Sequence, residues 1–345
     1  MRAARIHSYQ DSVDDALQID EVTQPEVERS TDIIVDITGA GWCQTDNHVI
    51  HGDWDEHYNP TLPLTLGHEN AGTVVEVGDE VETVAVGDTV LCQPMAVCGK
   101  CRPCRQGNDN LCENVEAPGF SMDGGFADLM RTSELAAVTF ENADPVEIAP
   151  HADAGITGYH AAKRAVRELN PGNHVAIVGI GGLGHIGLQV VDAMSATEIT
   201  AIDPKADARE LAESLGADHT LDPTSDDVRD EMDAITDGQG AAQILDYVGH
   251  DDTAEWGSAI VARGGDHHVA GYGGHVHTPT QALVGTEMSY CGTLTGTHTE
   301  LQELVELIER GDVDIHTTRY DLEDVNEVAQ RVRDGDILGR AVIVP

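Results

Sequence analysis

Residues 174–194, HVAIVGIGGLGHIGLQVVDAM, decide the fold of the middle of this 345-residue chain. The first residues predict a buried strand, and a glycine-rich turn then leads into a helix. The glycines follow the G-x-G-x-x-G pattern at Gly179, Gly181 and Gly184. Gly179 permits the tight turn, Gly181 lets a pyrophosphate approach the backbone, and Gly184 lets the helix pack on the strand. The stretch therefore predicts the start of a dinucleotide-binding sheet, whose phosphate-binding turn also contains Gly182 and Leu183.

The next predicted strand, EITAID, ends at Asp203, 24 residues after Gly179. An acid at this place accepts hydrogen bonds from the ribose 2′-OH and repels a 2′-phosphate. Asp203 therefore favours NAD(H) over NADP(H), while Lys205 and Arg209 lie close enough in sequence to keep NADP(H) open. The competing interpretation of Asp203 is a solvated loop acid in a very acidic chain.

The patterns on either side of this stretch differ. From about residue 150 strands alternate with helices, which predicts a doubly wound parallel sheet. Residues 1–150 instead alternate apolar and polar residues between glycine turns, as in a small antiparallel β-barrel. We therefore predict an α/β plus β fold, with a barrel-like domain at 1–150 and a dinucleotide-binding domain at 151–292. The segment 293–345 should end the second domain and return to the first through the β run DILGRAVIVP.

Four cysteines follow the barrel-like strands in the spacing C-x2-C-x2-C-x7-C, at Cys98, Cys101, Cys104 and Cys112. Four thiolates this close can surround one tetrahedral ion without leaving a position open, which predicts a structural zinc lobe at about residues 92–114. Two local disulfides or an iron–sulfur cluster are the alternatives. The other cysteines outside the active-site candidates, Cys92 and Cys291, are interpreted as buried small hydrophobic residues.

A second candidate metal site lies earlier, where Cys43 and His68 are flanked by Thr45, Asp46, His48 and Glu69. Thiolate and imidazole suit Zn²⁺, and a catalytic site keeps one position open. One cysteine and one histidine 25 residues apart are, taken alone, usually unrelated. Six further histidines are interpreted as surface or loop residues rather than ligands: His219, His267, His268, His275, His277 and His298.

The charge of the chain restricts its partners and its setting. Nineteen basic residues against 62 acidic ones give a net charge of −43, which would repel nucleic acid and anionic membranes. The acids are spread between apolar segments, which indicates a folded protein from a salt-rich cytoplasm rather than a disordered one. No stretch offers 18 uncharged apolar residues, and we expect a soluble, cytoplasmic protein.

Taken together, these motifs resemble the zinc-containing medium-chain alcohol dehydrogenases. The resemblance covers nearly the whole chain and rests on Cys43–His48, HGDW at 51–54, GHENAG at 67–72, the four-cysteine lobe, the glycine turn and Gly339-Arg340. It implies a GroES-like catalytic domain interrupted by a Rossmann domain, with the active site in the cleft between them. It also implies a zinc-dependent, NAD(P)-dependent alcohol dehydrogenase (EC 1.1.1.-, with 1.1.1.1 favoured) that carries two zinc ions per chain.

The resemblance assigns the catalytic zinc to Cys43 and His68. The third ligand of the family is usually the cysteine of a Cys-Ala-Gly-x-Thr stretch, and the matching stretch here begins with Asp153. Aspartate also binds zinc, so Asp153 is the expected ligand, with His151 as its rival. Glu69 is expected near the metal as an alternate ligand.

The resemblance also implies a mechanism. The alcohol is expected to bind zinc as an alkoxide, and its proton to pass through Thr45 and the cofactor ribose to His48. Asp46 would orient His68 by accepting its other ring N–H. Arg340 matches the residue that contacts the cofactor pyrophosphate.

Two residues are expected to line the substrate pocket. Trp54 matches a residue that narrows the pocket in the ethanol-active branch, while Gln93 stands where that branch has a bulky aromatic. We expect small primary or secondary alcohols and the corresponding aldehydes or ketones. A polyol or sugar dehydrogenase and a non-catalytic NAD(P)-binding redox sensor are the alternatives, and a homodimer or homotetramer is the expected assembly.

Overall fold

The computed structural model describes residues 1–345, apart from the side chain of His57. The chain divides into two compact units. Unit 1 comprises Met1–Ile156, Thr297–Arg310 and Ile315–Pro345, and unit 2 comprises Thr157–Gly296 and Gly311–Asp314. No helix among the described residues is long and apolar enough to cross a membrane.

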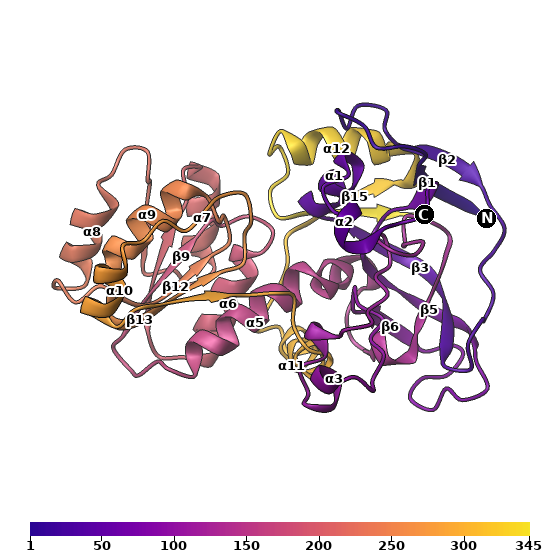
Figure 1. The fold of residues 1–345 in the computed structure, drawn as a ribbon, viewed down its shortest axis with the longest axis horizontal. Helices are drawn as coiled ribbons and strands as arrows, with labels where there is room; N and C mark the ends of the chain where they lie inside the picture. The colour runs from indigo at the N-terminus through magenta and orange to yellow at the C-terminus, as the bar shows by residue number, and fades with distance from the viewer. The chain divides into compact units, whose positions relative to one another are not determined.

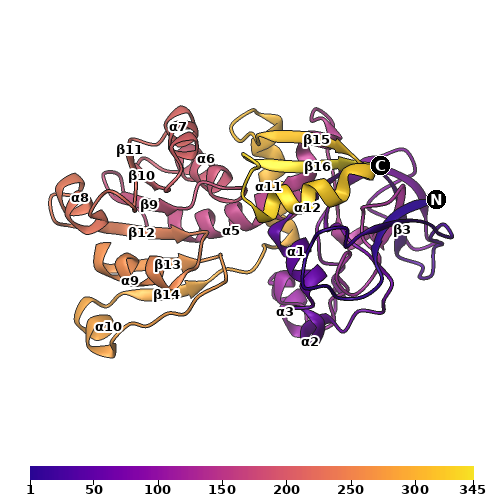
Figure 2. The ribbon, with the colours of Figure 1, turned by 90° about the horizontal axis from the view of Figure 1, so that it is seen from above.

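Unit 2 is built on a six-stranded parallel sheet, which confirms the predicted doubly wound fold. Figure 2 shows the strands in their order, from β11 at one edge through β10, β9, β12 and β13 to β14 at the other. The bounds are β9 (His174–Val178), β10 (Glu198–Ile202), β11 (His219–Leu221), β12 (Ala241–Asp246), β13 (Val261–Val269) and β14 (Ser289–Gly292). Since β9 pairs with both β10 and β12, the strand order reverses there, at the place where open α/β sheets bind their ligands.

In unit 2, helix α6 packs against α7, and helix α8 packs against α9 (Figure 1). The apolar run Val175–Val178 of β9 is fully buried, as expected for a strand covered on two sides. The helices are α5 (Ala154–Val166), which carries the chain from unit 1 into unit 2, α6 (Gly184–Met194), α7 (Ala206–Ser214), α8 (Val228–Ile235), α9 (Asp251–Ile260) and α10 (Thr280–Thr286).

Unit 1 contains a three-stranded sheet in the order β2-β1-β4 and a seven-stranded sheet in the order β15-β16-β3-β5-β6-β8, with β7 paired to β3. The long strand β3 (Asp32–Trp42) organises the larger sheet, since β5, β7 and β16 all pair with it antiparallel. The other strands are β1 (Arg2–Ile6), β2 (Gln18–Glu21), β4 (Leu64–Thr65), β5 (Glu69–Val77), β6 (Thr89–Cys92), β7 (Leu129–Ser133), β8 (Ala137–Thr139), β15 (Thr317–Asp321) and β16 (Arg340–Val344).

The core of unit 1 centres on Trp42 and Phe126, whose rings stack with centroids 4.8 Å apart. Short helices connect the strands of unit 1, and two longer helices, α11 and α12, lie in the C-terminal part of the chain. The helices of this unit are α1 (Gln44–His51), α2 (Asp55–Tyr58), α3 (Arg102–Arg105), α4 (Pro145–Ile148), α11 (His298–Glu309) and α12 (Val325–Arg333), with short 3₁₀ turns at η1 (Asp109–Leu111), η2 (Glu134–Ala136), η3 (Ala149–Ala152) and η4 (Leu322–Asp324).

The prediction that His267 and His268 are surface or loop residues is wrong. Both lie on β13, and their exposed fractions are 0% and 3%. The neighbouring strand β12 explains how two imidazoles are tolerated in the sheet, because Nε2 of His268 lies 2.8 Å from Oε1 of Gln243 and Nε2 of His267 lies 3.3 Å from Oδ2 of Asp246. The polar sequence Asp-His-His therefore does not indicate a surface segment. It belongs to a buried strand, and its polar side chains have hydrogen-bonding partners on the neighbouring strand.

The two cysteines interpreted as small hydrophobic residues differ in their surroundings. Cys92, at the end of β6, is buried as predicted, and burial raises the pKa of its thiol to about 12. Cys291, on the edge strand β14, is partly exposed, so the prediction that it is a buried residue is wrong. An edge strand has a neighbour on one side only, and this leaves its side chains less covered.

Candidate metal and dinucleotide sites

Cys43 stands at the corner where β3 ends and α1 begins. It is the N-cap residue of α1, with extended backbone angles φ −100° and ψ 153°. Its backbone N–H donates to Oδ2 of Asp46 over 2.9 Å, so the fully buried Asp46 closes the first turn of the helix. This local capping holds the Cys43 side chain in place at the end of the strand.

The same carboxylate orients His68. Oδ1 of Asp46 lies 3.1 Å from Nδ1 of His68, and both side chains are almost completely buried. An Nδ1–H donated to Asp46 leaves the lone pair on Nε2, which is the atom a metal would use. Nε2 lies 3.4 Å from Oδ2 of Asp153, on the residue just before α5.

Cys43, His68, Glu69 and Asp153 offer donor atoms that all lie within 4.8 Å of one another. Zinc bonds of about 2.1 Å at tetrahedral angles place neighbouring nitrogen and oxygen donors about 3.4 Å apart, as His68 and Asp153 are. The structure therefore brings the three expected ligands Cys43, His68 and Asp153 together, with Glu69 beside them. His151 is also buried but lies outside this set of donors.

The charges in this pocket fit a cation. Burial acts to raise the pKa of Asp153, but the hydrogen bond and charge of His68 bring it below its ordinary value, so Asp153 is ionised. Burial acts to lower the pKa of His68, yet the charge of Asp46 and the hydrogen bonds of Asp153 and Asp46 raise it well above its usual value. These carboxylates thus draw positive charge to the position between the donors, which is what a bound Zn²⁺ would supply.

Besides lying among the metal donors, Glu69 forms an ion pair with Arg340, which the sequence motifs do not reveal. Nε of Arg340 donates to Oε2 of Glu69 over 3.0 Å, and Nη2 of Arg340 donates to Oε1. The side chains are 8% and 0% exposed, so this is a buried bidentate ion pair. It holds the Glu69 carboxylate against arginine, while the predicted contact of Arg340 with a pyrophosphate stays a prediction.

The two residues of the predicted proton relay lie on one side of α1, three positions apart. Oγ1 of Thr45 lies 3.4 Å from Sγ of Cys43, which places this hydroxyl beside the metal donors. Nδ1 of His48 lies 2.8 Å from Oδ2 of Asp53, and the His48 side chain is 30% exposed. One group therefore touches the donor set, and the other reaches solvent.

An aromatic wall lies next to His68. The Phe120 ring stands 4.9 Å from the His68 ring, 5.0 Å from the Tyr58 ring and 6.5 Å from the Trp54 ring. Of these, the sequence motifs identify only Trp54, because Phe120 and Tyr58 lie in stretches without a recognisable pattern. Gln93, which follows β6, is completely buried. The ring nearest to His68 is thus Phe120, a residue that the sequence motifs did not identify.

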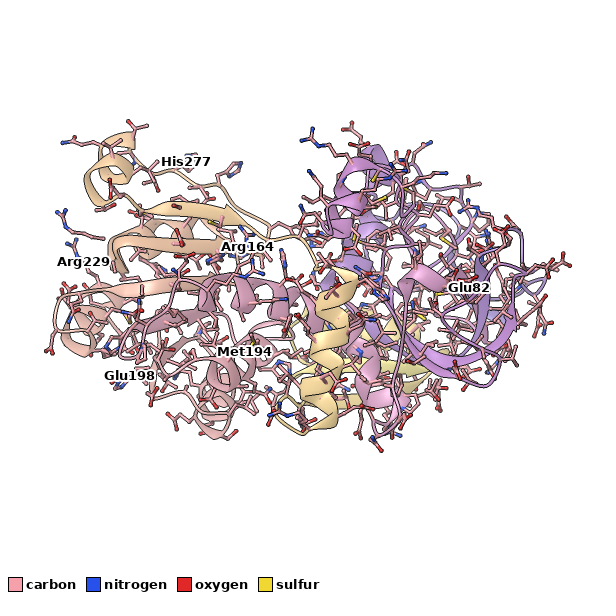
Figure 3. All side chains as sticks on the ribbon, turned by 90° about the horizontal axis from the view of Figure 1, so that it is seen from below. Glu82, Arg164, Met194, Glu198, Arg229 and His277 are labelled. Carbon is pink, nitrogen blue, oxygen red and sulfur yellow. The ribbon has the colours of Figure 1, made fainter. Side chains whose placement is uncertain are left out.

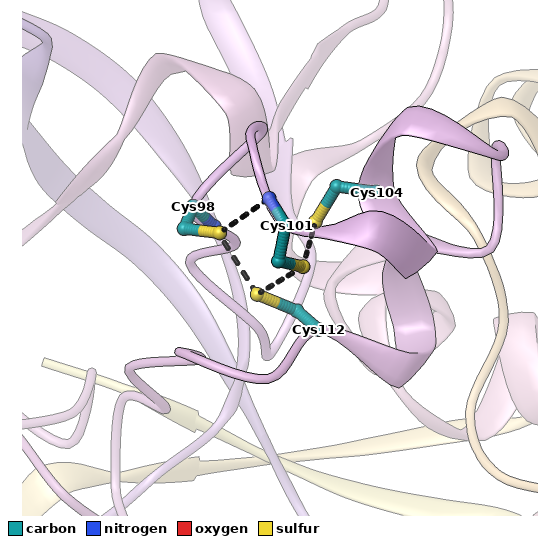
Figure 4. A group of neighbouring side chains, drawn as sticks. All are labelled: Cys98, Cys101, Cys104 and Cys112. Atoms are coloured by element: carbon teal, nitrogen blue, oxygen red, sulfur yellow. Dashed lines mark hydrogen bonds between the residues drawn. The ribbon is translucent and has the colours of Figure 1, made fainter.

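The four-cysteine lobe is shown in Figure 4. Sγ of Cys101 lies 3.3 Å from Sγ of Cys104 and 3.9 Å from Sγ of Cys112. Four thiolates around one zinc stand about 3.8 Å apart, given bonds of about 2.3 Å. All four sulfurs lie within 4.8 Å of one another as free cysteines, so the structure holds no disulfide between them.

The ionisation of these thiols is uneven. Backbone N–H groups of Lys100 and Cys101 lower the pKa of Cys98 to about 6. Burial raises the pKa of Cys104 to about 12 and also raises that of Cys112. The backbone of the lobe therefore favours the Cys98 thiolate, whereas a bound cation would be needed to ionise Cys104 and Cys112.

The glycine turn lies between β9 and α6 in unit 2. Gly179 has φ +82°, and a Cβ on Gly184 would stand 1.8 Å from the carbonyl oxygen of Gly179. A Cβ on Gly181 would meet no atom within 4 Å, so open space lies above this backbone. Gly182 and Leu183 follow directly, and α6 begins at Gly184, so the N-terminus of this helix lies at the turn. The geometry fits a pyrophosphate.

Asp203 is not a solvated loop acid. It is 8% exposed, and its carboxylate accepts the backbone N–H groups of Ile180 and Lys205, each over 2.8 Å. Nη1 of Arg209 donates to the Asp203 carbonyl oxygen over 2.7 Å. The carboxylate is therefore fixed beside the glycine turn, at the end of β10.

Comparison with known proteins adds the family. Residues 29–142 match the family described as "Alcohol dehydrogenase GroES-like domain", and residues 182–310 match "Zinc-binding dehydrogenase". The chain is 37% identical to an alcohol dehydrogenase of Geobacillus stearothermophilus over 347 residues, which cover 99% of this chain and 98% of that protein. It is 33% identical to a D-arabinose 1-dehydrogenase (NADP(+)) of Saccharolobus solfataricus over 334 residues, which cover 95% and 94%.

A solved structure is similar along its whole length. The crystal structure of the alcohol dehydrogenase from the hyperthermophilic archaeon Aeropyrum pernix aligns with a TM-score of 0.94 and 42% identity, covering 100% of both chains. Because such relatives span nearly the whole sequence and both family domains match in order, the chain belongs to the zinc-containing medium-chain alcohol dehydrogenases, with a GroES-like domain and a Rossmann domain.

Proposed function

We propose that the protein is a zinc-dependent alcohol dehydrogenase that transfers hydride reversibly between a primary or secondary alcohol and NAD(P), with NAD(H) preferred. The observation that carries the proposal is the buried donor set of Cys43, His68 and Asp153, with Asp46 fixing the His68 ring. Such a sulfur, nitrogen and oxygen set with three protein ligands is typical of catalytic zinc.

When bound, zinc supplies Lewis-acid stabilisation of charge on the alcohol oxygen, and NAD supplies the hydride acceptor. Cys43, His68 and Asp153 would hold the metal, and Asp46 keeps Nε2 of His68 directed at it. Glu69 stays beside the donors through its pair with Arg340. The aromatic wall around Phe120 would exclude water from the apolar side of the alcohol.

Proton transfer would use the two polar groups of α1. Thr45 lies beside the donor set, so its hydroxyl can accept the alcohol proton and release its own. His48 can take up a proton and return it to solvent, because its ring is partly exposed and its Nδ1 is held by Asp53. Both roles depend on the corner between β3 and α1.

The preference for NAD(H) would come from Asp203. Its carboxylate, held by two backbone N–H groups, would accept hydrogen bonds from the ribose hydroxyls and repel a 2′-phosphate. In the variant Asp203→Ala we expect the ratio of kcat/KM for NAD to that for NADP to fall by at least tenfold. An unchanged ratio would remove Asp203 from this role.

A sugar or polyol dehydrogenase is the second candidate, supported by the similarity to the D-arabinose enzyme and by the buried Gln93, whose amide could bind hydroxyl groups. Rates with ethanol, benzyl alcohol and D-arabinose separate the two. A kcat/KM for the sugar above that for both simple alcohols would favour the second candidate.

The central test is zinc content measured together with turnover. Asp153→Ala should lose one of two zinc ions per chain and all turnover, yet retain NADH binding, which cofactor fluorescence reports. The matched variant Asp153→Cys offers a thiolate in place of the carboxylate and should regain the ion. Two zinc ions and normal turnover in Asp153→Ala would contradict the assignment.

A further inference from the structure

Unit 2 contains a second set of metal-binding side chains, apart from the sites above. Asp251 is the first residue of α9, and His275 and His277 lie on the segment between β13 and α10. Their donor atoms all lie within 4.8 Å of one another. Figure 3 shows His277 at the outer surface of this unit. The set is open to solvent, since the side chains of His275 and Asp251 are 76% and 60% exposed.

The backbone brings these residues together. The N–H of His275 donates to Oδ1 of Asp251, which ties the segment to the start of α9. Gly274 makes the close approach possible, because a Cβ there would stand 2.5 Å from the backbone nitrogen of Asp251. The position of His275 over Asp251 is therefore set by a hydrogen bond from its backbone N–H and by the close backbone packing at Gly274, in addition to the side-chain ion pair.

The side-chain geometry is that of a metal site. Nδ1 of His275 lies 3.4 Å from Oδ1 of Asp251, the separation expected for neighbouring donors at about 2.1 Å from a tetrahedral ion. The rings of His275 and His277 lie 5.6 Å apart at an angle of 21°, so the second imidazole faces the same side. Alternation along an extended segment brings residues i and i+2 to one face.

The electrostatics favour a cation as well. The Asp251 carboxylate accepts the backbone N–H of His275 and lies beside both imidazoles. A simple ion pair would account for His275 and Asp251, but it would not use the second imidazole held in the same set. The net charge of −43 also concentrates cations at the surface.

We propose that Asp251, His275 and His277 form a surface site for a divalent first-row transition-metal ion. Two imidazoles and one carboxylate suit Zn²⁺, Ni²⁺ or Cu²⁺, with water in the remaining positions. The ion would fasten the segment 271–278 to α9. This segment follows the carboxyl end of β13, the side of an open α/β sheet on which ligands bind, so the ion would stiffen that edge.

Ni²⁺ is a suitable probe, added to the zinc-loaded full-length protein and followed by titration calorimetry. The double variant His275→Ala/His277→Ala should bind one Ni²⁺ fewer per chain than the wild type. Asp251→Asn keeps an acceptor for the His275 N–H but removes the charged ligand oxygen. It should weaken Ni²⁺ binding by about tenfold or more, since loss of even a supporting carboxylate costs about 10- to 100-fold. His219→Ala is the matched control, because it removes an imidazole that faces Glu198 elsewhere in unit 2.

Thermal unfolding gives an independent measurement. Ni²⁺ should raise the Tm of the wild type and of His219→Ala, and it should raise that of the double variant by less. Without added ion all variants should match the wild type, since the substituted side chains are exposed. Equal Ni²⁺ stoichiometry and affinity in the wild type and the double variant would overturn the proposal. Unchanged affinity in Asp251→Asn would equally refute the three-ligand site.

Discussion

Replacing Arg340 by methionine should strongly destabilise unit 1. The guanidinium makes two hydrogen bonds to Glu69, and the two side chains are 8% and 0% exposed. Removing one partner of such a pair leaves a buried charge without its counter-ion, which costs about 3–5 kcal/mol. Burial acts to raise the pKa of Glu69 and Arg340 acts to lower it, so Glu69 in this variant should take up a proton at higher pH.

The double variant Glu69→Leu/Arg340→Met tests how much of the stability lost in Arg340→Met comes from leaving the Glu69 carboxylate unpaired. Replacing both charges by apolar groups of similar size is often nearly neutral. We therefore expect the double variant to recover most of the stability that Arg340→Met loses, with a coupling energy of about 2 kcal/mol or more.

Equilibrium unfolding in urea at high salt is a suitable assay. Tryptophan fluorescence reports mainly on unit 1, because Trp42 and Trp54 lie there and only Trp256 lies in unit 2. Zinc content is measured in parallel, so that loss of metal is not mistaken for loss of the ion pair. A loss below about 1 kcal/mol for Arg340→Met, the range of exposed pairs, would refute the reasoning. A double variant as unstable as the single one would refute it too.

Three further predictions follow from charge and burial. The buried His268 has its pKa lowered to about 4, chiefly by burial, against about 6.5 in the unfolded chain, so its contribution is complete above pH 6.5 and is lost as the pH falls towards 4. The wild type should thus lose about 3 kcal/mol more than His268→Asn between pH 7 and pH 4 in urea unfolding, and equal losses would contradict this. Because the net charge is −43, dialysis from molar salt into dilute buffer should lower both Tm and activity, and full activity after prolonged dialysis would disprove the prediction. Cys104→Ser should release one zinc per chain and lower the Tm while the other zinc is retained, as metal analysis and calorimetry would show; two retained ions would exclude Cys104 as a ligand.

Some features of this protein were predictable from sequence because they depend on short-range geometry. The turn at Gly179 and the close packing at Gly184 are requirements of neighbouring backbone, so the letters of one stretch predict the strand, the turn and the helix. The four cysteines likewise lie within 15 residues, a spacing that lets one lobe gather four sulfurs. For Cys43 and His68 the resemblance to a family was needed, since their spacing alone carries little information.

Tertiary structure decided what depends on contacts between distant segments. Glu69 and Arg340 are 271 residues apart, and only the pairing of β16 with β3, and of β3 with β5, brings them together in a buried place. The aromatic partner of His68, Phe120, belongs to no motif, and the burial of His268 depends on Gln243 on the next strand.

The sequence by itself therefore determined the local elements, the two-part fold class and the residue types able to bind a metal. Which of these side chains form ion pairs, hydrogen bonds or a common metal site was decided by the packing of strands that are far apart in the sequence. The physical reason is that turns and caps follow from the sterics of a few residues, whereas burial and ion pairing depend on which distant surfaces exclude water together.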